Sequence, residues 1–249
     1  MPNPWILRCK GNSHRRLQLY CFAHAGASGA AFLSWQTAFD PSIEICAVQL
    51  PGRGARLAET PRVSISGLLD DLAALIARQG DLPFALLGHS LGGLLAFELA
   101  RRCQWQGLPT PSLLFVSGCA SPQRRRPPQA LHHLDDAGFI DALRVYNGTP
   151  RELLRNAEMM ELALPALRAD FQIAADYRYC PGPPLTVPIQ VLAGRQDDRM
   201  TSTEAEGWQS ETTQRCQVHW FDGDHFFIDS NRGAVQERVA AELAELICA

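Results

Sequence analysis

The fold of this chain is decided in the stretch Pro83-Phe84-Ala85-Leu86-Leu87-Gly88-His89-Ser90-Leu91-Gly92-Gly93. Its apolar first half predicts a short buried strand, and an apolar helical pattern runs on from the end of the stretch to Ala100. A strand that breaks sharply into a helix forces the serine at the break, Ser90, into a strained backbone conformation. Neighbouring side chains would collide there, which explains Gly88 and Gly92. The alternative is a tight glycine turn that merely contains a serine.

Composition is that of an ordinary soluble protein. The 249 residues, 46% hydrophobic and 20% charged, suffice for one large domain. A net charge of −3 gives no reason to expect nucleic acid or an anionic membrane as a partner. No apolar run approaches the ~20 residues of a membrane helix, and the N-terminus lacks the layout of a signal peptide. The eight cysteines stand singly, so we expect buried reduced thiols in a cytoplasmic protein, without a disulfide frame or zinc site.

Strand and helix patterns alternate along most of the chain. Besides the strand before Ser90, strands are predicted at residues 5–9, 17–23, 43–50, 112–118, 187–193 and 216–221. Helices are predicted at 30–39, 65–77, 203–210 and 233–247, as well as after Ser90. The first two strands indicate an opening hairpin that turns at 10–13. Such alternation predicts a mostly parallel sheet with helices on both faces.

The alternation stops between about residues 120 and 184. Helical segments are predicted here at 135–145, 151–154 and 158–177, the last interrupted near Pro165. An excursion of this length is best explained as a cap inserted over the carboxyl ends of the strands, where such folds bind ligands. We therefore predict a single α/β domain, residues 1–249, with a helical cap inserted at about 120–184.

A histidine is needed near Ser90, because a serine hydroxyl attacks well only when a base takes its proton. On folds of this kind the order along the chain is serine, acid, histidine. Only His225 lies between the last predicted strand and the last helix. His219 falls within that strand, His132 and His133 belong to the cap, and His89 is expected to pack beside the elbow. His225 is therefore the predicted base, with an ordinary loop histidine as the alternative.

The acid is expected after the strand at 187–193, where Asp197 and Asp198 both qualify by position. A buried aspartate there would hold the imidazole in the required tautomer and stabilise the imidazolium. The more ordinary use of either residue is a solvated or helix-capping loop acid. Asp224 adjoins His225, but adjacent side chains rarely point at each other. Position alone leaves Asp197 and Asp198 open.

Two backbone N–H groups are expected to bind the oxyanion that forms when a carbonyl is attacked. One belongs to Leu91, directly after the serine at the start of a helix. The other is expected in the loop after an early strand, which is His24-Ala25-Gly26-Ala27. Small residues let that backbone approach a substrate closely, although a simple turn is the alternative.

In this order the motifs resemble the type II (editing) thioesterases of nonribosomal peptide and polyketide synthases, which have the α/β-hydrolase fold. The resemblance spans nearly the whole chain, in FAHAGAS (22–28), QLPGR (49–53), GHSLGG (88–93), LPALRADF (164–171), YRYCPGPP (177–184), GRQDD (194–198) and GDHFF (223–227). It implies Ser90 as nucleophile, Asp197 as acid and His225 as base, because the family's acid stands three residues after the glycine matching Gly194. It also implies the N–H groups of Ala25 and Leu91 as oxyanion donors.

The resemblance further implies the reaction and the partner. Such enzymes hydrolyse acyl thioesters on the phosphopantetheine arm of acyl or peptidyl carrier proteins, without a cofactor or metal of their own. They remove misprimed or stalled acyl groups from a synthase, for instance in siderophore biosynthesis. The run Arg124-Arg125-Arg126 suggests a place where an acidic carrier docks, and a solvated loop is the alternative.

Other functions remain open on the same evidence. A medium-chain fatty acyl thioesterase or a carboxylesterase would prefer long acyl chains or simple esters. A non-catalytic carrier-binding protein would keep its effect without Ser90. Acyl transfer to a small nucleophile would show as capture of the acyl group by an added alcohol.

Overall fold

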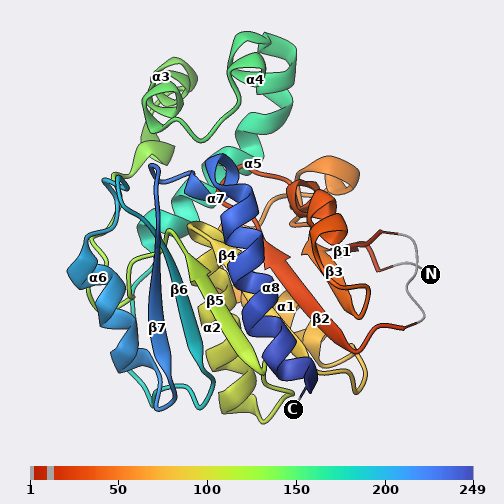
Figure 1. Cartoon of the computed structure of the whole chain (residues 1–249). Helices are drawn as coiled ribbons and strands as arrows, with labels where there is room; N and C mark the ends of the chain where they lie inside the picture. Colours follow the sequence, from red (N-terminus) through yellow and green to blue (C-terminus); the bar gives the residue numbers. More distant parts are fainter. Residues whose placement is uncertain (1–2, 10–13, 249) are drawn as a thin grey trace.

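The chain folds around a seven-stranded sheet that is parallel except at one edge (Figure 1). The structure is a computed structural model and describes residues 3–9 and 14–248. The strands are β1 (Ile6–Leu7), β2 (Leu17–Phe22), β3 (Ile43–Val48), β4 (Phe84–His89), β5 (Leu113–Ser117), β6 (Ile189–Gly194) and β7 (Cys216–Phe221). They lie in the order β1-β3-β2-β4-β5-β6-β7, and only β1 and β3 pair antiparallel. The predicted, mostly parallel α/β sheet is confirmed.

Helices cover both faces of this sheet, as predicted. One face packs against α1 (Ile65–Ile76) and α2 (Leu91–Gln106), and the other against the 3₁₀ helix η1 (Gly29–Ala38) and α8 (Arg232–Cys248). In Figure 1, α8 crosses in front of the strands while α1 and α2 lie behind them. The shorter elements are η2 (Gly54–Arg56), α6 (Ser202–Glu206), η4 (Gly207–Glu211) and α7 (Phe227–Ser230).

Strand β4 illustrates how the two cores form. Phe84 and Leu86 contribute to the core beneath α1 and α2, whereas Ala85 and Leu87 contribute to the core beneath η1 and α8. Because both faces are covered, every residue of β4 is buried. The elbow strand therefore has a continuous apolar sequence with no alternation of polar and apolar residues.

The first strand contradicts the predicted opening hairpin. β1 pairs with β3, with Ile6 opposite Val48, and not with β2. Both edges of β2 are already taken by parallel neighbours, β3 and β4, so the only open edge nearby belongs to β3. The expected turn at 10–13 lies outside the described residues.

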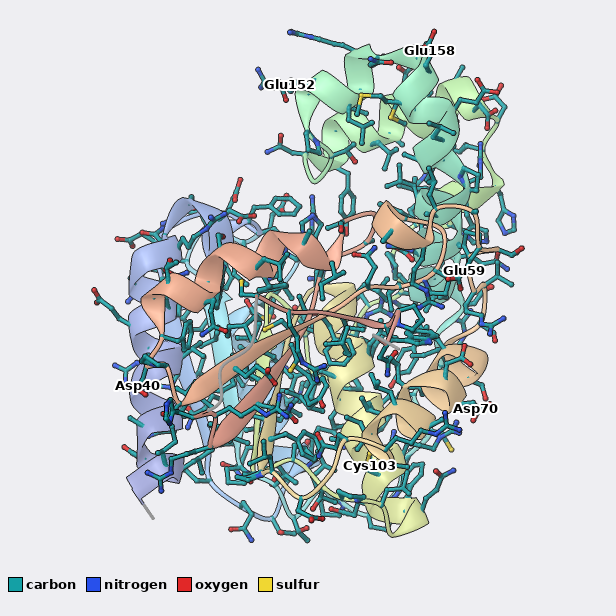
Figure 2. All side chains as sticks on the ribbon, turned by 90° about the vertical axis from the view of Figure 1, so that its right-hand side faces the viewer. Asp40, Glu59, Asp70, Cys103, Glu152 and Glu158 are labelled. Carbon is teal, nitrogen blue, oxygen red and sulfur yellow. The ribbon has the colours of Figure 1, made fainter. Side chains whose placement is uncertain are left out.

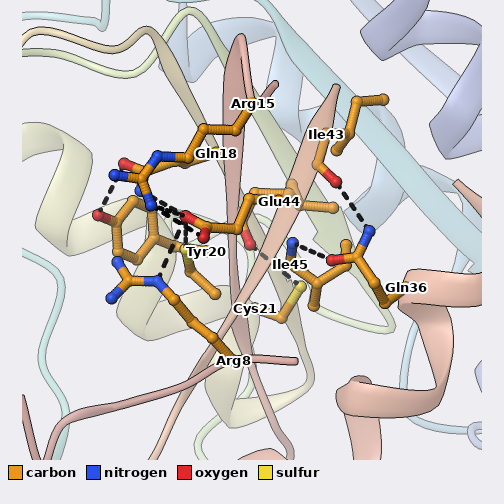
Figure 3. Close-up of polar contacts among 11 residues, drawn as sticks. Arg8, Arg15, Gln18, Tyr20, Cys21, Gln36, Ile43, Glu44 and Ile45 are labelled. Atoms are coloured by element: carbon orange, nitrogen blue, oxygen red, sulfur yellow. Dashed lines mark hydrogen bonds and ion pairs between the residues drawn. The ribbon is translucent and has the colours of Figure 1, made fainter. Parts of the chain in front are cut away.

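A buried carboxylate joins these first strands. Glu44 on β3 accepts hydrogen bonds from Gln18 on β2 (2.8 Å) and from Arg15 (3.1 Å), and it pairs with Arg8 at 3.3 Å. The Tyr20 hydroxyl donates in turn to Oε1 of the Gln18 side chain at 3.2 Å (Figure 3). Because the carboxylate is hydrogen-bonded and paired with cations, the pKa of Glu44 is lowered despite its burial.

Residues 131–176 form helices inserted between β5 and β6, within the predicted excursion. They are η3 (Leu131–His133), α3 (Asp136–Tyr146), α4 (Arg151–Arg155) and α5 (Ala157–Asp176). These inserted helices gather at one end of the sheet around their own hydrophobic cluster, which includes Phe139, Leu143 and Phe171 (Figure 1). Figure 2 shows Glu152 and Glu158 at the end farthest from the strands.

Helix α5 runs through Pro165 without the expected interruption. Proline has no N–H to donate to the carbonyl of Glu161, one turn earlier. Both residues are exposed, so water can hydrogen-bond to that carbonyl. The cost of the missing bond is therefore small enough for the helix to continue.

A buried polar network fixes the point at which the chain leaves α5. Tyr177 donates to Glu98 of α2 at 2.6 Å, and Arg101 donates to the same carboxylate oxygen at 2.8 Å. Arg101 also donates to the carbonyl of Cys180 at 2.6 Å. These bonds link the end of the inserted helices to the helix that follows Ser90.

The cysteines match the sequence prediction only in part. All seven with described side chains are free, and Cys21 and Cys46 are buried in strands, whereas Cys9 and Cys180 are exposed. Burial raises the pKa of the Cys46 thiol to about 12, which makes it unreactive. Within the described residues, none of the helices has the length and apolar character that a membrane span requires.

Replacing Tyr177 by Phe is expected to lower the free energy of unfolding by about 2 kcal/mol, because Glu98 loses a hydrogen bond within a buried network. Urea unfolding followed by circular dichroism measures the change. Tyr146→Phe is the matched control, since the Tyr146 hydroxyl makes no hydrogen bond to another described residue. Equal losses in the two variants would contradict the prediction.

Candidate active site

Ser90 lies at the break between β4 and α2. Its backbone has φ 56° and ψ −117°, a conformation that residues other than glycine rarely adopt. A Cβ on Gly88 would lie 2.0 Å from the carbonyl oxygen of Gly92, and one on Gly92 would lie 2.1 Å from that of Phe22. Only glycine fits at either position. The N–H of Ser90 donates to Ser117 of β5 at 2.8 Å, which ties the break to the neighbouring strand.

The structure brings Ser90, His225 and Asp197 together in one hydrogen-bonded row. His225 Nε2 lies 3.0 Å from Ser90 Oγ, and His225 Nδ1 lies 2.9 Å from Asp197 Oδ2. The Asp197 side chain is fully buried and that of His225 is 5% exposed. Both spacings allow a proton to pass from the hydroxyl to the imidazole while the carboxylate orients the ring.

The loops after β6 and β7 hold the acid and the histidine against each other. Arg195 N–H donates to Phe221 O at 2.8 Å, and Gln196 N–H donates to Gly223 O at 3.0 Å. A Cβ on Gly194 would lie 2.6 Å from the carbonyl oxygen of Asp224, so the two loops touch. Backbone bonds between neighbouring strand ends thus set the separation of the side chains that the loops carry.

Of the two aspartates that position alone left open, only Asp197, which the family resemblance implies, faces the histidine. Asp198 is 91% exposed at its side chain, and its nearest cation is Arg199 at 3.9 Å. Asp224 accepts a hydrogen bond from the Phe226 N–H at 2.8 Å and so caps its own loop. The chain turns at residues 195–196 and again at 198–199, so Asp197 and Asp198 face in different directions.

The other histidines have structural surroundings. His89 is buried beside His225, with ring centroids 5.2 Å apart, and its Nδ1 lies 2.9 Å from Ser117 Oγ. Its predicted packing role agrees with this position. His219 lies 2.7 Å from Gln190 Oε1 on the neighbouring strand, and the pair His132 and His133 is absent from the described lining of the cavity beside Ser90.

The predicted oxyanion donors flank Ser90. Leu91 is the first residue of α2, where N–H groups have no carbonyl one turn earlier to bond. Ala25 lies in a turn closed by a 3.0 Å bond from Ala27 N–H to His24 O. Gly26, the third residue of that turn, has φ +80°, as a type II turn requires. Ala25 and Leu91 both line the cavity that contains Ser90 and His225.

That cavity has a volume of about 340 Å³ and lies between the strand ends and the inserted helices. Tyr146, Phe171 and Ala174 form its wall on the inserted side, and Arg125 and Arg126 line it from the segment before η3. The volume falls at the lower end of the range for small-molecule sites. Among the described residues, no cluster of three or more His, Cys, Asp or Glu side chains is placed to hold a metal ion.

Arg199, which the sequence analysis did not single out, joins the inserted helices to the rest of the molecule. Its guanidinium lies 3.6 Å from the centroid of the Tyr146 ring and donates to the Tyr146 carbonyl. Nearby, His24 Nε2 lies 3.3 Å from Gly148 O. In the sequence, the one sign of a role for Arg199 is that a basic residue follows the candidate acids Asp197 and Asp198. Nothing in the sequence links it to Tyr146.

The arginine run is held by the protein and is not simply solvated. Arg124 donates to Thr203 O at 3.0 Å, and Arg125 donates to Ala174 O at 2.9 Å. Arg126 pairs with Glu204 at 3.1 Å while 72% of its side chain stays exposed. Arg124 and Arg126 are both exposed, and Arg126 also lines the cavity.

We expect the free energy of unfolding to fall as pH drops from about 6.5 to about 5. Burial lowers the pKa of His89 far below its usual value and also lowers that of His24, so the folded protein protonates both histidines only at a lower pH than the unfolded chain does. The unfolded chain protonates these histidines near pH 6.5, which costs up to about 1.4 kcal/mol per pH unit for each. Urea unfolding between pH 7.5 and 5 measures the slope. His89→Gln should reduce the slope, and an unchanged slope would contradict the prediction.

Comparisons with known proteins place this geometry in a family. The thioesterase domain family matches residues 17–243. Gramicidin S biosynthesis protein GrsT of Aneurinibacillus migulanus is 38% identical over 97% of this chain and 94% of its own length. The type II thioesterase BorB from the borrelidin biosynthetic cluster has a TM-score of 0.89 at 35% identity, covering 98% of this chain and 99% of BorB. YbtT, a type II thioesterase from the yersiniabactin NRPS/PKS pathway, has a TM-score of 0.83 at 32% identity, covering 95% of this chain and 97% of its own. With matches over nearly its full length, the chain belongs to the thioesterase family.

Proposed function

We propose that this protein is a type II thioesterase that removes acyl groups from the phosphopantetheine thiol of carrier proteins. The observation that carries the proposal is the row Ser90, His225 and Asp197 at 3.0 and 2.9 Å beneath a cavity, in a chain that belongs to the thioesterase family. GrsT is named for gramicidin S biosynthesis, BorB is a type II thioesterase from the borrelidin biosynthetic cluster, and YbtT is one from the yersiniabactin NRPS/PKS pathway. We infer that the partner is a carrier domain of such a synthase, making an antibiotic or a siderophore, and that the enzyme works in the cytoplasm.

In the first half of the proposed reaction, Ser90 Oγ attacks the thioester carbonyl while His225 Nε2, 3.0 Å away, accepts the hydroxyl proton. Asp197 stabilises the imidazolium that forms. The N–H groups of Ala25 and Leu91 bind the oxyanion. The tetrahedral intermediate then expels the thiolate, which takes the proton from His225. The products of this half are a free thiol and an acyl ester on Ser90.

In the second half, His225 takes a proton from water, and the resulting hydroxide attacks the ester on Ser90. The same N–H groups bind the second oxyanion, and His225 returns the proton to Ser90 Oγ as the acid leaves. A thiolate is a better leaving group than an alkoxide, so the first half is fast with thioesters. Small activated esters are expected as side substrates.

The cavity beside Ser90 is where we expect the acyl group to bind. Its volume of about 340 Å³ is bounded by Tyr146, Phe171 and Ala174 of the inserted helices. We propose that residues 1–249 form one domain in which the inserted helices act as a cap over Ser90. We propose that short, misprimed acyl groups are the substrates, and the cavity volume by itself does not separate them from medium-chain groups.

The proposal is tested with a carrier protein loaded with acetyl-, hexanoyl- or palmitoyl-phosphopantetheine. Release is followed by the mass of the intact carrier. We expect kcat/KM to be highest for the acetyl form, and Ser90→Ala to lower it by roughly 10⁴-fold or more. A preference for palmitoyl or simple esters would support the alternative hydrolases, and full activity of Ser90→Ala would overturn the proposal.

The two neighbouring aspartates provide a matched pair of variants. Asp197→Asn is expected to lower kcat by about 10⁴-fold, because an amide at this position favours the wrong histidine tautomer. Asp198→Asn changes a carboxylate that lines the cavity but is 91% exposed and makes no hydrogen bond to His225, so its effect on kcat should be at least about 100-fold smaller. Hydrolysis of acetyl-N-acetylcysteamine, detected through the released thiol, measures both. Similar losses in the two variants would reject Asp197 as the acid.

A further inference from the structure

A buried ion pair lies directly against the loop that carries Ala25. Asp170 belongs to α5 and is 2% exposed, and Arg53 follows β3 and is 8% exposed. Arg53 donates to both oxygens of the carboxylate, NH1 to Oδ2 at 2.5 Å and NH2 to Oδ1 at 2.8 Å. The two residues stand 117 positions apart in sequence. Neither has a role in the reaction steps described above.

Asp170 makes a third hydrogen bond, and this one reaches the oxyanion loop. Its Oδ2 accepts from the Gly26 N–H at 2.7 Å, in the peptide unit directly after Ala25. Arg53 NH1 also lies 3.4 Å from the carbonyl oxygen of Ala27. Leu167, one turn before Asp170, fills the space where a Cβ of Gly26 would stand, at 2.2 Å. The turn at residues 24–27 therefore rests on α5 and on the ion pair.

We infer that Asp170, held in place by Arg53, is a positioning residue that fixes the oxyanion loop for catalysis. The inference rests on the proposed function in taking the Ala25 N–H as an oxyanion donor. An oxyanion hole works because its donors are already aimed when charge develops. The loop of Ala25, Gly26 and Ala27 has no polar side chain to anchor itself. A charge-assisted bond to the Gly26 N–H supplies that anchor and fixes the middle peptide of the turn.

The burial of the pair supports a role in geometry. Removing two charges from water costs about as much as their attraction returns, so a buried ion pair contributes little net stability. This pair instead gives one defined arrangement to three segments: α5, the loop after β3 and the loop after β2. Because α5 is one of the inserted helices, the oxyanion loop and the cavity wall share one support.

The experiment compares Asp170→Asn, Asp170→Ala and the double variant Arg53→Met with Asp170→Leu. The double variant leaves no unpaired charge buried, so it keeps the inference testable if a single variant fails to fold. Glu98→Gln is the matched control, since Glu98 accepts from Arg101 in another buried pair that does not contact the oxyanion loop. Thermal unfolding of each variant gives its stability.

Activity is measured on acetyl-N-acetylcysteamine, which needs no carrier protein. Asp170→Ala and the double variant should lower kcat/KM by roughly 10- to 100-fold, mostly through kcat. The upper end of this range equals the smallest loss seen when one oxyanion donor is removed outright. Asp170→Asn should lose less, because its amide oxygen can still accept from the Gly26 N–H. The control should stay within about threefold of the wild type.

Two inhibitors separate positioning from a general loss of structure. A trifluoromethyl ketone adds to Ser90 and places an oxyanion in the hole, so its Ki should rise in step with the fall in kcat/KM. A thioether with CH₂ in place of the carbonyl has no oxyanion, and its Ki should not change. The inference is supported if the Ki of the ketone rises as kcat/KM falls while the Ki of the thioether stays constant.

Losses that track only the folded fraction, equal losses in Glu98→Gln, or an unchanged Ki for the ketone would overturn it. Failure of the proposed function looks different, because Ser90→Ala would then keep its activity. An inactive Ser90→Ala together with fully active Asp170 variants would reject this inference alone.

Discussion

The backbone at Ser90 is held at φ 56°, a conformation that residues with side chains normally avoid, and the position of the candidate site depends on it. Gly88 and Gly92 remove the Cβ atoms that would lie 2.0 and 2.1 Å from backbone oxygens. β4 lies in the middle of the sheet, hydrogen-bonded to β2 and β5. Strain of this kind persists only where the surroundings fix it, and a central, fully buried strand provides such surroundings. The Ser90 hydroxyl is therefore held at the carboxyl end of the sheet, where it faces the cavity.

The remaining site groups arrive at the same edge because parallel strands end together. Asp197 follows β6, His225 follows β7 and Ala25 follows β2, so three loops from distant parts of the sequence converge on Ser90. The loops bond to each other through backbone groups, as between Gln196 and Gly223. The sheet therefore sets the positions of the catalytic side chains, and short loops are enough to carry them.

Sequence was sufficient for features that local patterns encode. The elbow at Ser90, the parallel sheet and the position of His225 follow from apolar periodicity, glycine spacing and strand order. Local patterns left two outcomes open, although the family resemblance already implied Asp197 for one of them. Asp197 and Asp198 differ only in the direction of their side chains, which a loop sets in three dimensions. The partner of β1 depends on which strand edges remain open, and that is known only when β2, β3 and β4 have all been placed.

The pair Arg53 and Asp170 shows a further limit of local patterns, and its cause lies in the oxyanion loop itself. A backbone N–H can approach a reacting carbonyl only where side chains are small, which is why Ala25, Gly26 and Ala27 stand there. The same smallness deprives the loop of groups that would hold it. Support must therefore come from outside, as hydrogen bonds to its backbone, and a buried carboxylate is a strong acceptor for the purpose. A carboxylate without a cation would be too costly to bury, so Arg53 accompanies Asp170. The need for close approach to substrate thus accounts for a charged pair in the interior.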